Sequence, residues 1–347
     1  MKNVFVVVPT LDPDEEIMST FIKELKKEFK HILVVNDGSN SAHDKFFKSL
    51  EKEGIEVIGH YKNLGKGRGL KNAFNYLLEH HKNLEGVVTC DCDGQHSVKD
   101  IKRCAENLLE NPNKLVLGVR NFDNDNVPPR SKFGNKITRN IFKLFIGLEI
   151  SDTQTGLRGL SKDLMVRFMD LPGERYEYET NVLIQCKEEN VGISEVEIET
   201  IYLNSNANSH FNPLRDSIMI YKLFMKYILV ALSSFVLDIL LFTGMFGILR
   251  INSKILAATI LARVVSSIYN YLINSNLIFK DMSLRSLVKY YILAVVQMFI
   301  SGCFVTYLYS LLNISVVFIK VLVDLAIWVI NLVIQREFVF VGDKNEK

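Results

Sequence analysis

The chain has 347 residues, with 41 basic and 39 acidic side chains. A formal net charge of +2 implies no overall attraction to nucleic acid, so we expect no nucleic-acid partner. Five irregularly spaced cysteines do not suggest a disulfide framework. The sequence is charged and mixed up to about residue 222, and long apolar runs dominate from there to about residue 340. This change predicts a soluble domain followed by a membrane domain.

The chain begins with a short apolar run, Val4–Val8, that Pro9 stops. A secretory signal needs an apolar core of about 7–15 residues and a cleavage site of small residues. The run therefore predicts a buried first strand, and we expect the first domain to stay in the cytoplasm.

Short β-rich runs alternate with helical patterns through the first half. Strands are expected at 4–8, 32–35, 55–60, 86–90 and 115–118, and helices near 14–29, 41–53, 66–81 and 98–110. This alternation predicts an α/β fold with a mostly parallel sheet, and the near-continuous apolar strands indicate that both sheet faces are covered. Ligands bind beyond the carboxyl ends of such strands.

Polar and turn-forming residues follow all five predicted strands. These loops are 9–15, 36–39, 63–67, 91–96 and 118–120. Any one of them is consistent with an ordinary turn, but five at one sheet edge predict a functional site. Within them, Gly65–Gly69 fits neither the P-loop nor the dinucleotide-binding spacing. It predicts a loop that opens the next helix, with Lys66 able to reach an anion at the helix N-terminus.

The strongest single motif is Asp91-Cys92-Asp93 at the end of the fourth strand. Two carboxylates one residue apart can face a common divalent ion, and hard oxygen ligands favour magnesium or manganese over zinc. Such a metal can bridge the two phosphates of a nucleotide sugar and neutralise the departing diphosphate. Cys90 and Cys92 resemble half a zinc site, but no second pair follows.

Six motifs follow one another along the first half of the chain. They are Val8-Pro9-Thr10, Val34-Val35-Asn36-Asp37-Gly38-Ser39, Asn63-Leu64-Gly65-Lys66-Gly67, Asp91-Cys92-Asp93-Gly94-Gln95-His96, Arg130-Ser131, and Asp152-Thr153-Gln154-Thr155-Gly156-Leu157-Arg158-Gly159. In order and spacing they resemble the family 2 glycosyltransferases of GT-A fold, in particular the dolichol-phosphate-mannose-synthase-like branch. The resemblance covers roughly residues 3–215. It implies a Rossmann-like GT-A domain and an inverting transfer from a nucleotide-sugar donor.

The resemblance also implies roles for individual residues. The donor would lie against Pro9, Asp12, Glu15, Asp37, Lys66 and Asp91. The metal, Mg²⁺ or Mn²⁺, would be held by Asp91, Asp93 and Gln95. The acceptor phosphate would face Arg120, Arg130 and Ser131. The residues expected to be essential for catalysis are Asp91, Asp93, Arg120, Arg130 and Arg158.

A lipid phosphate is the expected acceptor. A phosphate monoester is already anionic at neutral pH, so arginines can orient it without a strong general base. A hydroxyl acceptor would need a carboxylate base, for which Glu177 and Glu179 are the visible candidates. The alternative interpretation of these two residues is an acidic pair at a helix start, favoured by the macrodipole.

Four apolar segments follow, each long enough to cross a bilayer core, which takes about 20 residues. They span about Tyr227–Leu249, Ile255–Phe279, Tyr290–Leu312 and Ser315–Gln335. The expected organisation is a catalytic domain (1–212), an interfacial amphipathic helix or plain linker helix (213–226), a membrane domain (227–340) and a tail (341–347).

Loop charges predict the orientation of these spans. Arg250 and Lys254 fall on one side, and the other side carries Lys222, Lys226, Lys280, Arg285, Lys289, Arg336, Lys344 and Lys347. Both chain ends are therefore expected in the cytoplasm, on the side of the nucleotide sugar.

The membrane half also contains an internal repeat, because residues 270–279 align with residues 331–340. The pattern resembles the GtrA-like four-span domain of proteins that handle polyprenyl-linked sugars. The same offset places Arg263 opposite Asp324, and Asp238 and Lys320 also lie inside the spans. These four charges predict either a structural ion-pair network, which their depth favours, or a site for the lipid phosphate. Polar faces in the spans are compatible with a homo-oligomer.

The resulting hypothesis is a glycosyltransferase that acts at the cytoplasmic membrane face. It would place a sugar on an undecaprenyl- or dolichyl-type polyprenyl phosphate and supply a lipid-linked sugar for cell-envelope glycan modification. The alternatives are a membrane-anchored glycosyltransferase with a hydroxyl acceptor, and a translocase of lipid-linked sugar with a degenerate enzyme domain. The intact set of Asp91, Asp93, Arg120 and Arg158 argues against degeneracy.

Overall fold

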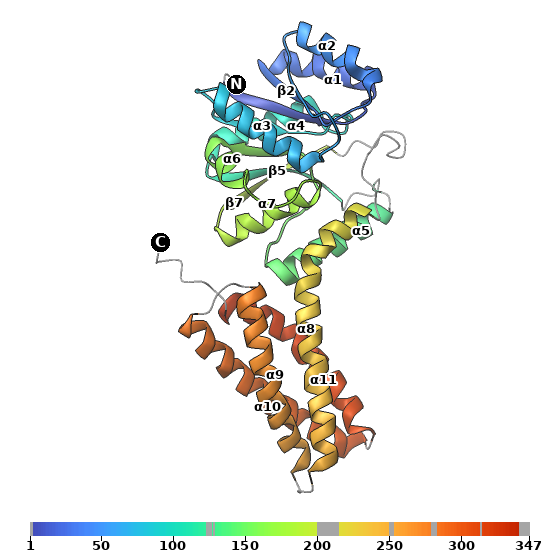
Figure 1. The fold of residues 1–347 in the computed structure, drawn as a ribbon, viewed down its shortest axis with the longest axis vertical. Helices are drawn as coiled ribbons and strands as arrows, with labels where there is room; N and C mark the ends of the chain where they lie inside the picture. Colours follow the sequence, from blue (N-terminus) through green and yellow to red (C-terminus); the bar gives the residue numbers. More distant parts are fainter. Residues whose placement is uncertain are drawn as a thin grey trace. The chain divides into compact units, whose positions relative to one another are not determined.

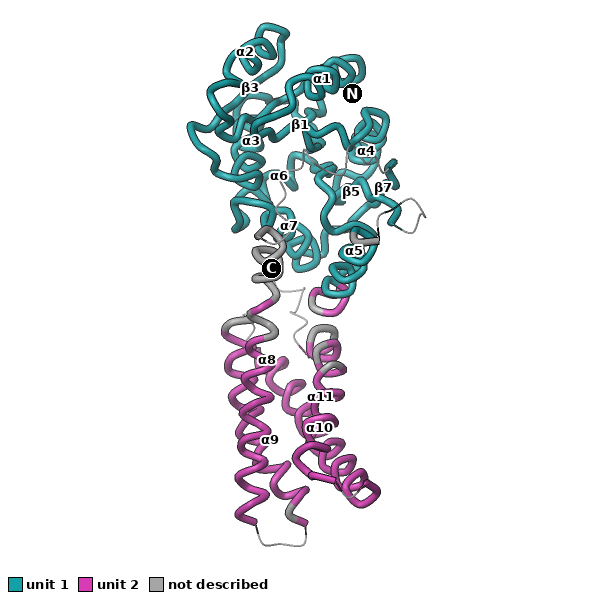
Figure 2. The backbone as a smooth tube through the Cα atoms, turned by 90° about the vertical axis from the view of Figure 1, so that its right-hand side faces the viewer, with its two compact units in different colours: residues 1–142, 148–220 teal, residues 143–147, 221–347 magenta. Residues whose placement is uncertain are grey.

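The computed structural model describes residues 3–122, 127, 129–199, 215–249, 253–278, 283–312 and 314–339. The chain divides into two compact units. The first comprises residues 1–142 and 148–220, and the second comprises residues 143–147 and 221–347 (Figure 2).

A seven-stranded sheet forms the centre of the first unit. Its strands are β1 (Val4–Thr10), β2 (His31–Asn36), β3 (Glu56–Gly59), β4 (Gly86–Thr89), β5 (Lys114–Arg120), β6 (Arg158–Ser161) and β7 (Gly192–Ile198). The strand order is β3-β2-β1-β4-β6-β5-β7, and only β6 runs antiparallel to its neighbours. The predicted mostly parallel α/β fold is therefore confirmed, with β6 and β7 as strands that the sequence patterns did not predict.

Helices cover both faces of this sheet (Figure 1). On one face α1 (Glu15–Glu28), α2 (Asp44–Lys52) and α4 (Val98–Glu110) bury one continuous apolar core against the strands. On the other face lie α3 (Lys66–His80), α6 (Lys162–Phe168) and α7 (Glu177–Glu188). Covering both faces explains why all residues of β1 are buried and why its sequence is continuously apolar.

Local sequence determines where these helices begin. The Asp14 side chain accepts hydrogen bonds from the amides of Glu16 and Ile17 at the start of α1. The Ser97 side chain does the same for the amide of Asp100 at the start of α4. Each cap satisfies backbone donors that have no partner within the helix.

The strand register brings the predicted loops together at one sheet edge. Thr10 at the end of β1 pairs with Asn36 at the end of β2, and Val7 pairs with Thr89 at the end of β4. Because β6 lies antiparallel between β4 and β5, these two strands point the same way. The loops after β1, β2, β4 and β5 therefore share the carboxyl edge of the sheet.

In the part of the chain that the structure describes, the second unit contains four long helices. They are α8 (Arg215–Ile248), α9 (Lys254–Ile273), α10 (Leu284–Leu312) and α11 (Val316–Ile334). Within the described residues, Ile255–Asn276 and Leu284–Leu312 are long and apolar enough to cross a membrane, and Leu232–Ile248 is a shorter apolar helix. The predicted interfacial segment and the predicted first span form one unbroken helix, α8, although residues 213 and 214 lie outside the described residues.

The second unit exposes apolar side chains and buries charged ones. Leu240 and Ile292 are more than half exposed, whereas Lys320 is fully buried and Asp238 and Asp324 are nearly so. This distribution is the reverse of that in a water-soluble domain, and it matches helices whose outer faces contact lipid.

The buried charges form one closed network. Arg263 Nη2 lies 3.2 Å from Asp238 Oδ2 and 3.1 Å from Asp324 Oδ2. Lys320 Nζ lies 3.3 Å and 2.7 Å from the same two oxygens. Ser266 on α9 and Ser301 on α10 donate to the remaining carboxylate oxygens. Of the two predicted roles for these charges, the ion-pair network is the one that the geometry forms.

Candidate active site

Lys66, the first residue of α3, lies between two acidic side chains. Its Nζ atom is 2.8 Å from Asp91 Oδ1 and 3.2 Å from Glu179 Oε2. The centre of the Tyr176 ring lies 5.9 Å from the same nitrogen. The lysine therefore links the end of β4 to the start of α7, and it stands at the helix N-terminus where the sequence predicted an anion contact.

The electrostatics of the site follow from this arrangement. Burial by itself disfavours the charged form of Lys66, but Asp91 and Glu179 outweigh it and raise the pKa of Lys66 well above its usual value. Burial would raise the pKa of Asp91, but the Lys66 charge lowers that pKa to about 2. Burial and the charge of Asp91 raise the pKa of Asp93 to about 6. Lys66 thus stays cationic, and Asp91 stays anionic.

The segment 152–157 crosses the strand ends and packs against Asp91. Thr89 donates through its hydroxyl to the carbonyl of Gly156 at 2.9 Å. A Cβ atom at position 156 would overlap the carboxylate of Asp91. Any larger residue at this position would therefore displace the carboxylate of Asp91, which is predicted to bind the metal.

Asp93 and Gln95 belong to a tight turn after β4. The amide of Gln95 donates to Asp93 Oδ1 at 3.1 Å, and the amide of Asp91 lies 3.2 Å from Nδ1 of the buried His96. The turn therefore keeps both carboxylates in the loop at the carboxyl end of β4.

The donor set of this turn fits a hard divalent cation. Within the described residues, no group of three or more His, Cys, Asp or Glu side chains surrounds one point. A metal held by Asp91 and Asp93 would therefore complete its oxygen shell from water, an amide oxygen or a diphosphate, as Mg²⁺ usually does. The acidic side chains here exceed the basic ones by one, with Asp91, Asp93 and Glu179 against Lys66 and Arg158. A bound cation would balance this excess negative charge.

Arg120 is held by a carboxylate that the sequence analysis did not single out. Its Nε lies 2.7 Å and its Nη2 lies 3.2 Å from the two oxygens of the buried Asp152, and its guanidinium lies 5.1 Å from the Phe122 ring centre. Asp152 thus orients the predicted acceptor-binding arginine at the end of β5. Asp152 could have been predicted as a site residue from the sequence, because it begins the Asp152–Gly159 motif.

Arg158 lies inside the domain, 3% exposed. It donates to the carbonyls of Thr155 and Glu179, and its Nε is 3.8 Å from Glu179 Oε1. The predicted catalytic Arg158 therefore lies behind Glu179, where it can act by positioning that carboxylate.

The two acidic residues Glu177 and Glu179 make different contacts. Glu177 Oε1 accepts hydrogen bonds from the amides of Glu174 and Arg175, which closes the loop before α7. Glu179 is buried between Lys66 and Arg158. Each carboxylate uses one oxygen for its closest contacts, and Glu177 Oε2 and Glu179 Oε1 accept no hydrogen bond from the described residues.

Asp37 organises the loop that leads to Lys66. Its two carboxylate oxygens accept hydrogen bonds from the amides of Leu64 and Gly65, and its Oδ1 lies 2.7 Å from His60 Nδ1. The Asp37 side chain is buried, at 4% exposed, and both of its oxygens bind protein groups. The structure therefore places this predicted donor-binding residue where it orders the loop before Lys66.

The loops after β1 and β2 form one surface. Asp12 accepts from the amide of Asn40 at 2.7 Å, its own amide donates to Ser39 Oγ at 2.9 Å, and Glu15 Oε1 lies 2.7 Å from His43 Nδ1. Asp12 needs this support because its backbone has φ of +42°, in the left-handed region. Pro9, also predicted to contact the donor, is buried next to the end of β1.

Two predicted acceptor residues lie on α5 (Pro129–Ile141). Ser131 is half-buried there, while the side chain of Arg130 lies outside the described residues.

Two family models match the chain. Residues 5–167 match Glycosyl transferase family 2, and residues 226–340 match the GtrA/DPMS transmembrane domain. The class that the fold and the site define is thus a glycosyltransferase domain of α/β type joined to a membrane domain. The chain belongs to glycosyl transferase family 2.

Two curated relatives are similar over most of their own length. An uncharacterized protein of Methanocaldococcus jannaschii is 32% identical over 231 residues, which cover 65% of this chain and 93% of the relative. The UDP-N-acetylglucosamine–dolichyl-phosphate N-acetylglucosaminyltransferase of Methanococcus voltae is 28% identical over 246 residues, 65% of this chain and 96% of the relative. Among solved structures, glucosyl-3-phosphoglycerate synthase from Mycobacterium tuberculosis is 16% identical, with a TM-score of 0.49 over 66% of this chain and 79% of that chain.

Proposed function

We propose that this protein transfers a sugar, with inversion, from a nucleotide sugar to a polyprenyl phosphate of undecaprenyl or dolichyl type. The main support for this proposal is the position of Asp91 at the carboxyl edge of the sheet. Asp91 lies beside Lys66 there, in the same loop as Asp93. The relative from Methanococcus voltae, named for transfer to dolichyl phosphate, supports the acceptor class. The product is a lipid-linked sugar suited to modifying cell-envelope glycans.

In this proposal the donor lies over the loops after β1, β2 and β4. Pro9, Asp12, Glu15 and Asp37 shape the nucleoside pocket, and Lys66 contacts the diphosphate. Asp91, Asp93 and Gln95 hold Mg²⁺ or Mn²⁺. When bound, that ion neutralises the charge that develops on the leaving diphosphate.

The acceptor phosphate lies against Arg120, Arg130 and Ser131. Asp152 holds the Arg120 guanidinium in one orientation through its Nε and Nη2 atoms, so the arginine is preorganised to meet a phosphate oxygen. An anionic phosphate oxygen attacks the sugar without losing a proton, and catalysis rests on positioning and charge stabilisation. A hydroxyl acceptor is less favoured, because Glu177 caps a loop and Glu179 pairs with Lys66 and Arg158.

The membrane arrangement is part of the same proposal. The catalytic domain spans 1–212, a linking helix 213–226, four membrane spans 227–340 and a tail 341–347. Both chain ends lie in the cytoplasm, where nucleotide sugars are made. A translocase with a degenerate enzyme domain is less favoured, because the acidic turn and the Lys66–Asp91 pair are both intact.

The first test is transfer of labelled sugar to polyprenyl phosphate by the purified full-length protein with Mg²⁺ or Mn²⁺, using a panel of nucleotide sugars. Asp93→Ala is expected to abolish transfer because it removes half of the carboxylate pair. Glu106→Ala, which alters an exposed acid on α4, is the control and should retain full activity.

Two outcomes contradict the proposal. Robust transfer in excess chelator would exclude the metal role of Asp91 and Asp93. Transfer to sugar hydroxyls, with none to polyprenyl phosphate, would overturn the acceptor.

A further inference from the structure

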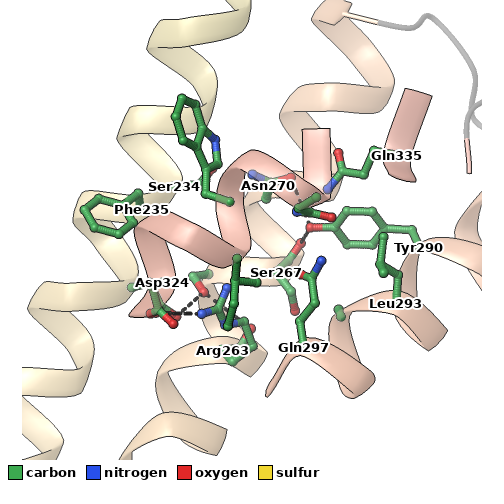
Figure 3. Close-up of a pocket in the computed structure, with 16 residues that line it drawn as sticks. Ser234, Phe235, Arg263, Ser267, Asn270, Tyr290, Leu293, Gln297, Asp324 and Gln335 are labelled. Carbon is green, nitrogen blue, oxygen red and sulfur yellow. Dashed lines mark hydrogen bonds and ion pairs between the residues drawn. The ribbon is translucent and has the colours of Figure 1, made fainter. Parts of the chain in front are cut away.

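The buried charges of the second unit already serve one another. Arg263 and Lys320 are each paired with Asp238 and Asp324, beside a cavity of about 60 Å³ (Figure 3). Ligand pockets usually measure about 300–1,000 Å³, so this space has room for water and not for a sugar or a lipid headgroup. A buried side chain with a free hydrogen-bonding group lies instead in the first unit, in the turn after β4.

His96 closes that turn and is 7% exposed. Gly94 has φ of +77°, which lets the chain reverse, and Ser97 caps α4 directly after the histidine. The His96 backbone is thus fixed between the turn and the helix. Its ring folds back over the turn, so that Nδ1 lies 3.2 Å from the amide nitrogen of Asp91.

The contact with Asp91 determines where the His96 ring carries its proton. A backbone amide can only donate, so Nδ1 is the acceptor and holds no hydrogen. The ring is therefore neutral, with its one proton on Nε2. A ring nitrogen that carries a proton has no lone pair for a metal, so Nε2 is a hydrogen-bond donor here and not a further ligand of the cation.

The Nε2–H group of His96 is free. It has no hydrogen-bond partner among the described residues, and it is not one of the unsatisfied polar atoms that the protein seals from solvent. Buried side chains rarely leave a donor without a protein, water or ligand partner. This N–H is therefore the part of His96 that can meet a substrate at the carboxyl edge of the sheet.

The charges around the ring indicate which part of the site this donor faces. The side chains that act on the ring most strongly are Asp91, Arg120, Lys66 and Asp152. Arg120 and Asp152 are bonded to each other and are far from His96 in the sequence, so the ring lies on the β5 side of the turn. His96 thus lies between the carboxylates proposed to hold the metal and the arginine proposed to hold the acceptor.

A neutral donor suits this position. Lys66 and Arg120 are already cationic, and a bound metal would add further positive charge, so another cation here would be repelled. An uncharged N–H group can bind an anionic phosphate oxygen beside Arg120 and adds nothing to that repulsion.

We propose that His96 is a further catalytic residue, whose Nε2–H donates a hydrogen bond to the acceptor phosphate beside Arg120. The inference rests on the proposed function, which supplies a phosphate as the acceptor. It gives His96 a contact with the substrate in addition to its contact with the turn.

Two substitutions separate these contacts. His96→Asn keeps an acceptor near the position of Nδ1 and removes the donor at Nε2, whereas His96→Gln places an amide N–H near Nε2 and removes the acceptor. Each purified variant is assayed with Mg²⁺ or Mn²⁺, a short-chain polyprenyl phosphate and the nucleotide sugar that the wild type uses. His80→Asn, at an exposed position near the end of α3, is the matched control and should behave as the wild type does.

His96→Asn should raise the KM for the polyprenyl phosphate at least about tenfold, because one hydrogen bond to a charged group is lost. Its KM for the nucleotide sugar, its metal requirement and its melting temperature should stay close to those of the wild type, because the Asp91 amide keeps a partner. His96→Gln should retain most of the affinity for the polyprenyl phosphate and should need more metal, because the turn loses its internal contact.

A histidine that only supports the turn predicts the opposite order, with His96→Asn like the wild type and His96→Gln impaired, and that result would overturn the proposal. Equal losses in both variants would overturn it as well. So would a raised KM for the nucleotide sugar alone in His96→Asn, because the N–H would then face the donor.

The wild-type assay keeps the two proposals apart. If the wild type uses polyprenyl phosphate and His96→Asn keeps the wild-type KM for it, only the role of His96 is refuted. If the wild type makes no polyprenyl-linked sugar, the proposed function is refuted, and the contact of His96 with an acceptor phosphate is refuted with it.

Discussion

At the residue scale, the site depends on how Lys66 divides its charge between two carboxylates. Asp91 Oδ1 is the nearer partner at 2.8 Å, and Glu179 is at 3.2 Å. Arg158 in turn lies 3.8 Å from Glu179. Glu179 therefore competes with Asp91 for the lysine, which leaves Asp91 more negative than an exclusive pair with Lys66 would.

Glu179→Gln tests this positioning role. Without the Glu179 charge, Lys66 should pair only with Asp91 and oppose cation binding there. We expect the metal concentration for half-maximal activity to rise about tenfold, the equivalent of about 1.4 kcal/mol, with a smaller change at saturating metal. Glu188→Gln, at an exposed position on the same helix, should leave both quantities unchanged.

The same variant separates positioning from general-base catalysis. If Glu179 were the base for a hydroxyl acceptor, activity at saturating metal would fall by about 10²–10⁴-fold. A loss of that size, with an unaltered metal requirement, would contradict the role given to Glu179 here.

At the element scale, α3 and the loop before α7 act as one unit. Arg68 and Lys71 on α3 bind the carboxylate of Glu174, and the amide of Arg68 donates to the Glu174 carbonyl. The glycines of the 65–69 stretch make this contact possible. Gly65 has φ of +104°, and a Cβ on Gly67 would lie 2.6 Å from Tyr178 Cβ. The glycine-rich pattern therefore serves close packing of a distant loop as well as the approach of an anion.

Gly67→Ala should destabilise the catalytic unit. The added methyl group would lie 2.8 Å from the Arg175 carbonyl oxygen and must push the loop off α3. We expect a loss of about 1–3 kcal/mol, seen as a lower melting temperature, together with reduced activity because Lys66 moves with the helix start. Gly134→Ala on α5 has open space around the new methyl group and should be neutral or slightly stabilising. An unchanged melting temperature for Gly67→Ala would refute this packing account.

At the scale of the whole molecule, the two units of the chain are suited to two different surroundings, water and lipid. The sheet domain buries apolar residues on both faces of its strands, whereas the helical unit buries charges and exposes leucine, isoleucine and valine. The ion-pair network joins α8, α9 and α11, and Ser301 adds α10, so the bundle has a polar centre that lipid cannot replace. Such a unit is stable with its outer faces in a membrane.

The proposed four-span topology can be tested with single cysteines. In a background in which all five native cysteines are replaced, Asn252→Cys should react with a membrane-impermeant maleimide in intact cells. Ser283→Cys should react only after the membrane is opened, because the positive charges of its loop hold it in the cytoplasm. The opposite labelling pattern would reverse the orientation and would separate the catalytic unit from cytoplasmic nucleotide sugars.

Much of the catalytic fold was predictable because its strands are apolar runs bounded by turn residues. β6 was missed because it begins with Arg158, whose charge is met by the carbonyls of Thr155 and Glu179 and not by water. β7 was missed although Val196 and Ile198 are buried and Glu195 and Glu197 are exposed. This alternation of period two was present in the sequence and marks a half-exposed edge strand.

The sequence by itself determined which side chains reach the carboxyl edge of the sheet, because parallel strands with one connection pattern end on the same side. It also determined the family, the apolar segments and the repeat. Only the tertiary structure decided the partners: Lys66 with Asp91 and Glu179, Arg120 with Asp152, and Arg263 with both buried aspartates. These pairs join residues far apart along the chain. Their geometry depends on how loops and helices cross in space, and no local pattern encodes that crossing.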